Sequence, residues 1–179
     1  MILTICINTV AVALSMCFCS FMEWFVHGPL MHGKLATKFL RGTHEDHHRP
    51  ASYKSEEHSV RLPWWAPVVM LMPVAILTSI VGWFISHWEV AVLSILTSLC
   101  YYTAYQYVHM CLHERPDGVK KRWIKSTKWF ARRDMTHRIH HAHEVDFDRP
   151  VNLGILTSFW DRFIGTYRSS EATKREVLC

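Results

Sequence analysis

The stretches 43–49 (THEDHHR) and 136–142 (THRIHHA) both contain the pattern H-x-x-H-H. A helix places positions i, i+3 and i+4 on one face, so each stretch can direct three imidazoles into one space. Two further pairs accompany them, spaced H-x4-H in 27–32 and H-x3-H in 109–113. The four motifs supply ten of the 13 histidines: His27, His32, His44, His47, His48, His109, His113, His137, His140 and His141. So many imidazoles in so few motifs indicate metal binding, and ten are enough for two ions.

Three long apolar blocks predict an all-α integral membrane protein. Residues 2–22, 62–88 and 90–112 contain no Asp, Glu, Lys or Arg. Each block reaches the roughly 20 helical residues that cross a hydrocarbon core. The first lacks the basic start and cleavage site of a signal peptide, which favours a retained span. We therefore expect about three transmembrane helices, near 2–26, 63–86 and 90–112, in a single domain covering 1–179.

The distribution of positive charge predicts the orientation in the membrane. All 20 Lys and Arg lie within 34–61 or from 115 onward, and basic loops stay on the cytoplasmic side. The turn 86–89 is too short for a domain, so the second and third spans form a hairpin. The regions 27–61 and 109–167, which carry all four histidine motifs, then lie together on the cytoplasmic face. This location explains the net charge of +5 without nucleic-acid binding.

The segments outside the spans are predicted as irregular or interfacial structure. Gly28-Pro29 is expected to disrupt the regular helix just past His27. Residues 119–143 are predicted as a helix whose aromatic and basic residues suit the membrane interface or a cap over the site. Residues 153–167 are apolar but too short to span, so they are expected to pack at the interface.

Three histidines fall outside the predicted site. His87 lies in the turn between two spans, on the opposite side of the membrane, and is left out. His58 has no neighbouring histidine and is interpreted as a surface residue. His143 follows His141 by two residues, and its sequence position fits equally well a hydrogen-bonding neighbour of the ligands and a residue without a role.

The residue types leave the metal and the class of protein open. Imidazole ligands suit zinc, copper, iron and nickel, and spacing does not choose among them. Oxygen chemistry needs iron or copper, whereas a zinc-binding or zinc-transport protein is the competing class. A transporter should carry ionisable residues in the middle of its spans, and these middles are nearly bare. A haem protein would use one or two histidines per haem and leave most of the ten unexplained.

The motifs HGPLMH, HEDHH, HMCLH and HRIHH, in that order and divided by an apolar hairpin, resemble the fatty acid hydroxylase superfamily of membrane-bound di-iron oxygenases. This superfamily includes lipid hydroxylases, sterol desaturases and carotenoid ring hydroxylases. The resemblance runs from about Glu23 to Tyr167. The ending SFWDRFIGTY is similar to the sterol and fatty acid branch, whereas the short chain with one early span is more like bacterial carotenoid hydroxylases.

The resemblance implies two iron ions held only by histidines, with zinc as a possible occupant of the purified protein. One ion would take His32, His44, His47, His137 and His140, and the other His27, His48, His109, His113 and His141. It further implies activation of dioxygen and attack on an unactivated C–H bond of a membrane lipid. The product would be an alcohol, or an alkene after a second hydrogen abstraction. An acyl chain or sterol-like lipid stands slightly ahead of a carotenoid as the substrate.

The implied chemistry needs electrons from outside the chain. The sequence has no CxxCH haem motif, no cysteine cluster for iron–sulfur and no glycine-rich nucleotide loop. An external donor such as a ferredoxin or a b-type cytochrome is therefore expected. The basic stretch 120–133 is a candidate docking surface for an acidic partner, although the orientation in the membrane explains the same charge.

Overall fold

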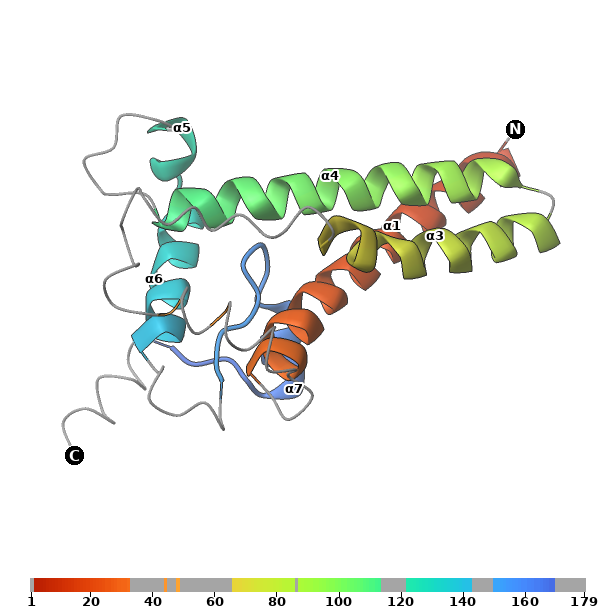
Figure 1. Cartoon of the computed structure of the whole chain (residues 1–179). Coiled ribbons are helices and arrows are strands. Elements are labelled where there is room, and N and C mark those ends of the chain that lie inside the picture. Colours follow the sequence, from red (N-terminus) through yellow and green to blue (C-terminus); the bar gives the residue numbers. More distant parts are fainter. Residues whose placement is uncertain are drawn as a thin grey trace. The chain divides into compact units, whose positions relative to one another are not determined.

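The computed structural model describes residues 2–32, 44, 48, 66–85, 87–113, 122–142 and 150–169. Every regular element among these residues is helical, which confirms the predicted all-α class for the described part of the chain. The elements, labelled in Figure 1, are α1 (Ile2–Phe25), η1 (Val26–His32), α3 (Ala66–Phe84), α4 (Trp88–His113), α5 (Arg122–Lys125), α6 (Lys128–Ala142) and α7 (Phe159–Ile164).

The chain divides into two units. The first comprises Met1–Met22 and Leu62–Gln106, and the second comprises Glu23–Arg61 and Tyr107–Cys179. The helices α1 and α4 contribute residues to both units. All ten predicted metal ligands belong to the second unit by their sequence positions. The predicted single domain stays a prediction.

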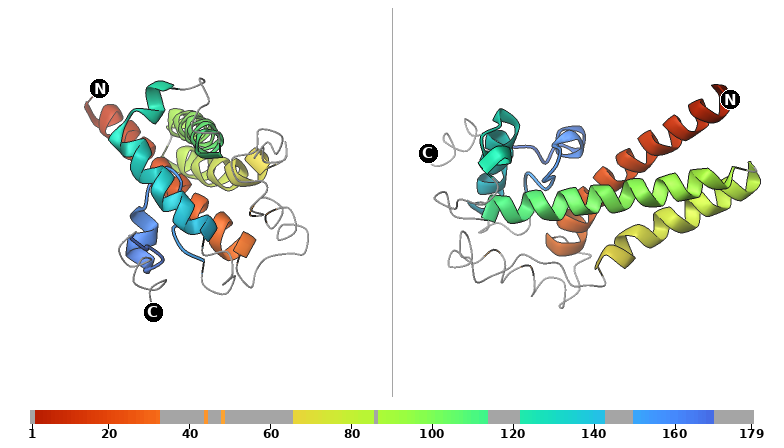
Figure 2. Two further views of the ribbon diagram at one scale, coloured as in Figure 1. Left: turned by 90° about the vertical axis from the view of Figure 1, so that its left-hand side faces the viewer. Right: turned by 90° about the horizontal axis from the view of Figure 1, so that it is seen from above.

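In the first unit, α3 and α4 form the expected hairpin and run antiparallel in the views of Figures 1 and 2. The turn is tight, because His87 N donates to Gly82 O at 2.9 Å and a Cβ on Gly82 would lie 2.9 Å from His87 O. Between α1 and α4, the Cys19 thiol donates to Ser98 Oγ at 3.3 Å. Such small side chains let two helices approach closely.

Only one helix among the described residues is long and apolar enough to cross a membrane, the continuous run Ile2–His32 near the N-terminus. Within α3, Met72–Phe84 forms a shorter apolar stretch. The helices α3 and α4 occupy nearly the residues predicted for the second and third spans. The prediction of about three transmembrane helices is therefore not confirmed by length and composition.

In the second unit, the helices depart from regular geometry at one predicted place and at one that was not predicted. The regular helix α1 ends at Phe25, and the wider π-helical η1 contains Pro29, in line with the expected disruption near His27. The continuous helix predicted for 119–143 is wrong, because α5 and α6 are separated at residues 126–127. Thr127 Oγ1 accepts from Phe130 N at 3.1 Å, so a threonine caps the start of α6.

The chain after α6 forms a buried, non-helical stretch that we call the 151–156 segment. Its residues 151–155 are all buried, and Asn152 adopts a left-handed φ of 54°. The Asn152 side chain holds this conformation by donating from Nδ2 to Arg168 O and accepting from Arg168 N, at 3.1 and 2.9 Å. The short helix α7 follows, ends at Ile164 and is capped by Gly165, whose φ is 89°.

Candidate metal centre

Nine of the ten predicted ligands lie in the described part of the chain, and all nine side chains are buried. The most exposed is His141, at 8%. They come from η1, from residues 44 and 48, from the end of α4 and from α6. The tenth, His47, lies outside the described residues. Four sequence motifs therefore converge on one water-excluded region of the second unit.

Eight of the nine rings form two groups, and the ninth ring joins them. In each group the potential ligand atoms lie within 4.8 Å of one another. The ring of His141 stacks on His48, with centroids 4.3 Å apart, and its centroid is 4.6 Å from that of His137. His141 thus touches both groups. The five-histidine group contains His27, His32, His44, His48 and His140, and the three-histidine group contains His109, His113 and His137.

In the five-histidine group, more ring nitrogens meet at one atom than pairwise hydrogen bonding can satisfy. The Nε2 atom of His44 lies 2.7 Å from His32 Nε2 and 2.9 Å from His48 Nε2. A neutral ring nitrogen carries either one hydrogen or one lone pair, so it cannot hydrogen-bond two such atoms together. Lone pairs directed at a shared cation satisfy all of these nitrogens at once. The donor set therefore fits a metal ion.

Two rings of this group are oriented by backbone carbonyls of the 151–156 segment. His27 Nδ1 lies 2.7 Å from Leu153 O, and His140 Nδ1 lies 2.8 Å from Val151 O. A carbonyl oxygen only accepts, so Nδ1 carries the hydrogen and Nε2 keeps its lone pair. Metal-binding histidines commonly have their tautomer and ring orientation fixed in this way.

The three-histidine group joins α4 to α6. His109 and His113 are one helical turn apart on α4, with ring centroids 4.9 Å apart, as the H-x3-H spacing predicts. His137 of α6 closes the group, and its Nε2 lies 2.8 Å from His113 Nε2. Together with the adjacent His141, these rings supply four imidazoles, which are enough to hold a second metal ion.

Burial sets the protonation state of the cluster. The pKa values of His44, His137 and His140 lie well below the ordinary 6.5, first because burial penalises the charged ring and then because neighbouring imidazoles oppose its charge. These rings are neutral at pH 7, and neutral imidazole is the form that binds metal.

The grouping in the structure differs from the predicted partition of the ligands. His27 and His48 lie with His32, His44 and His140 rather than with the α4 pair, and His137 lies with His109 and His113. Positions three apart on a helix project about 60° apart. His137 and His140 therefore meet different neighbours, and the bond from His140 to Val151 O keeps its ring in the five-histidine group.

Among the described residues, His87 is the one histidine outside this cluster. His87 belongs to the first unit, where its Nδ1 lies 2.6 Å from Glu89 Oε1. His58 and His143 lie outside the described residues, so their predicted roles stay predictions.

Sequence reasoning gave no role to two buried carboxylates beside the cluster. Glu23 is 3% exposed and Asp161 is 0% exposed, and both accept hydrogen bonds from the 151–156 segment. A signal was present, because Glu23 is the only charged residue before Lys34 and Asp161 interrupts an apolar stretch. A charged residue in apolar sequence is seldom fully buried unless it is paired.

Comparison with protein families identifies the chain. The sequence model for fatty acid hydroxylase matches residues 12–166. The chain belongs to the fatty acid hydroxylase family. The match covers all four histidine motifs and the 151–156 segment, and it confirms the resemblance drawn from the motifs. No curated protein and no solved structure matched the chain. This fatty acid hydroxylase family member thus carries a buried histidine cluster with the donor set of a metal site.

Proposed function

We propose that the protein is an oxygen-dependent di-iron hydroxylase that attacks an unactivated C–H bond of a membrane lipid, either an acyl chain or a sterol-like lipid. The observation that carries this proposal is the pair of buried histidine groups in a chain of the fatty acid hydroxylase family. The five-histidine group would hold one iron. The three-histidine group with His141 would hold the other, and His47 is the tenth proposed ligand.

The protein's own residues would bind and orient the metals and exclude water. Iron, when bound, supplies the oxygen activation and C–H chemistry that amino-acid side chains lack. The buried rings present neutral nitrogens, and the carbonyls of Val151 and Leu153 hold two of them in the Nδ1–H tautomer. The low exposure of all nine rings keeps bulk water from the centre, which limits side reactions.

The proposed membrane arrangement has three spans, with the metal centre on the cytoplasmic side. The support is apolar side chains exposed along all three long helices, such as Leu14 at 64%, Ile76 at 54% and Leu96 at 53%. Contiguous exposed apolar surface is unfavourable in water but suits lipid. Trp83 and Trp88 are also exposed near the α3–α4 turn, where an aromatic belt at the membrane surface is expected.

The proposed partners are dioxygen, the lipid and an external electron donor, either a ferredoxin or a b-type cytochrome. We assign the exposed Lys128 and Arg132 of α6 to the donor's docking surface, because their charge would complement an acidic donor. Lowering the positive charge of this surface should slow reduction of the metal centre by the donor, and the effect should be larger at low ionic strength.

Product analysis with oxygen-18 tests the function. The iron-loaded protein in lipid vesicles receives reduced ferredoxin, labelled dioxygen and a panel of acyl, sterol and carotenoid lipids. We expect one labelled oxygen in a lipid alcohol, and none with the matched His44→Ala/His48→Ala variant. An alkene without label would instead identify a desaturase, and a labelled carotenoid alcohol a ring hydroxylase. No product from any lipid, with zinc retained tightly, would favour the zinc-binding class.

A further inference from the structure

The 151–156 segment contacts two metal-site rings that come from different parts of the chain. Val151 O accepts from His140 of α6, and Leu153 O accepts from His27 of η1. Asn152 lies between the two carbonyls in its left-handed conformation. The position of this one segment therefore sets the orientation of two rings in the five-histidine group.

Asp161 of α7 holds the middle of the segment. Its Oδ1 accepts from Leu153 N at 2.8 Å and its Oδ2 accepts from Gly154 N at 2.9 Å. Thr166 Oγ1 also donates to Oδ1, at 2.7 Å. A fully buried carboxylate needs such donors, because it has lost its hydration. The three bonds make Asp161 a fixed anchor for the segment.

Glu23, just before η1, holds the next part of the segment. Its Oε1 accepts from Ile155 N and, at 3.0 Å, from Leu156 N. Arg133 of α6 donates to Ser158 Oγ at 2.8 Å, and its positive charge interacts favourably with both carboxylates. Two acids and one base thus surround the segment from three helical elements.

We propose that Asp161 and Glu23 are positioning residues of the metal centre. Together they hold four consecutive backbone N–H groups, from Leu153 to Leu156. This keeps the carbonyls of Val151 and Leu153 against His140 and His27, and leaves the Nε2 lone pairs of these two rings available to a metal ion. The inference rests on the metal centre of the proposed function, and is independent of which lipid is attacked.

The test separates the two histidine groups with cobalt(II) as the probe. In a His109→Ala/His113→Ala background the five-histidine group remains, and in a His44→Ala/His48→Ala background the three-histidine group remains. Asp161→Asn is introduced into each detergent-purified, full-length protein. Cobalt(II) is then titrated by its visible absorption, in competition with a chelator.

We expect Asp161→Asn to weaken cobalt(II) binding about tenfold in the five-histidine background, since loss of a group that orients a ligand costs roughly 10–100-fold in affinity. The amide has nearly the size of the carboxylate, but its NH2 group is a donor where a carboxylate oxygen accepts from a backbone N–H. The segment therefore loses a hydrogen bond without a change in packing volume. Binding in the three-histidine background should stay within error. Equal weakening in both backgrounds would reveal a general structural role and overturn the inference, as would no weakening in either.

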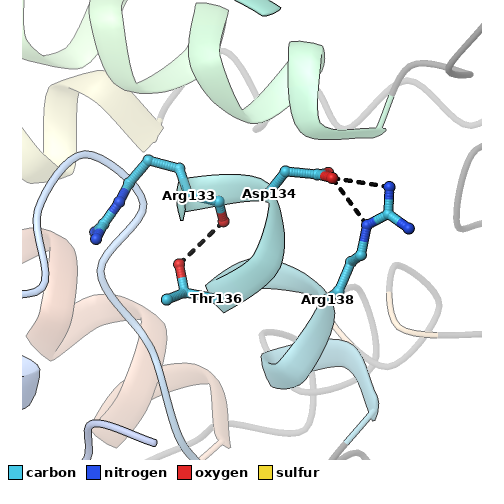
Figure 3. Close-up of polar contacts among 4 residues, drawn as sticks. All are labelled: Arg133, Asp134, Thr136 and Arg138. Atoms are coloured by element: carbon cyan, nitrogen blue, oxygen red, sulfur yellow. Dashed lines mark hydrogen bonds and ion pairs between the residues drawn. The ribbon is translucent and has the colours of Figure 1, made fainter. Parts of the chain in front are cut away.

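Asp134→Asn provides the matched control. Asp134 lies on α6 before its three histidines, but it pairs with Arg138 at 2.8 Å. Figure 3 shows that pair on the side of α6 away from the Arg133 side chain. This acid-to-amide change should leave both affinities unchanged. If Asp161→Asn does not fold, Glu23→Gln tests the same segment through its other anchor. Absence of cobalt(II) binding in the unsubstituted protein would refute the metal centre itself, and the inference with it.

Discussion

Replacing Gly154 by alanine should displace the segment that orients His27. A Cβ at this position would lie 2.0 Å from Thr157 O, where ordinary van der Waals contact begins at 3.4 Å. It would also lie 3.0 Å from Asp161 Oδ2. The nearest atom is backbone, so no side chain can rotate away, and the segment must move by about 1 Å or more.

The size of this shift decides what happens to the metal centre. The bond between His27 Nδ1 and Leu153 O measures 2.7 Å, so a shift of about 1 Å along it exceeds hydrogen-bonding range. Overpacking of this kind costs about 1–3 kcal/mol. For a chain of this size, about 3 kcal/mol corresponds to a fall in Tm of roughly 6–12 °C. Metal in the five-histidine group should be lost as well.

The assay compares Gly154→Ala with Gly165→Ala by thermal melting and metal analysis. Gly165 has a φ of 89°, but a Cβ added there would meet nothing within 4 Å, so its substitution costs only the left-handed strain of about 1–2 kcal/mol. Gly165→Ala should therefore keep its metal while losing some stability. If Gly154→Ala melts at the wild-type temperature with full metal content, the positioning argument is refuted.

Three further predictions concern stability and metal retention. Asn152→Ala should be less stable than Asn152→Gly by about 1 kcal/mol, because only glycine accepts the left-handed φ freely; equal melting temperatures would contradict this. His137→Ala should lose metal from the three-histidine group, whereas His87→Ala should keep the full metal content. Equal metal contents in the two variants would contradict this assignment. The metal-free protein should melt at lower temperature as pH falls below 6.5, because the lowered pKa values of the buried rings mean that the unfolded chain binds more protons; a Tm unchanged between about pH 7.5 and 5.5 would oppose this.

Helical spacing is a local property, so the sequence was sufficient to predict which histidines of one motif share a helix face. The H-x3-H pair on α4 and the H-x-x-H-H motif on α6 adopt the helical faces that their spacing predicts. The all-α class also followed from the apolar blocks. These features depend on neighbours within one turn of the chain, which sequence patterns report directly.

The assignment of each ring to a group was not predictable from spacing. It depends on contacts between residues far apart in sequence, such as His140 with Val151 O and His27 with Leu153 O. The break between α5 and α6 was missed for another reason. The apolar and basic pattern runs through it without interruption, whereas the Thr127 side chain accepts from Phe130 N and starts a new helix there. Likewise, Asp161 gave a visible signal as a charge in an apolar stretch, but its acceptor role required the fold.

The most direct test of the account is the metal content of the detergent-purified protein, expressed with iron supplied, beside the His48→Ala and His141→Ala variants. We predict two iron ions per chain in the wild type, matching the two histidine groups, and a loss of metal in both variants. Wild-type protein without metal, or variants that retain the full wild-type content, would contradict the proposal of a dimetal centre.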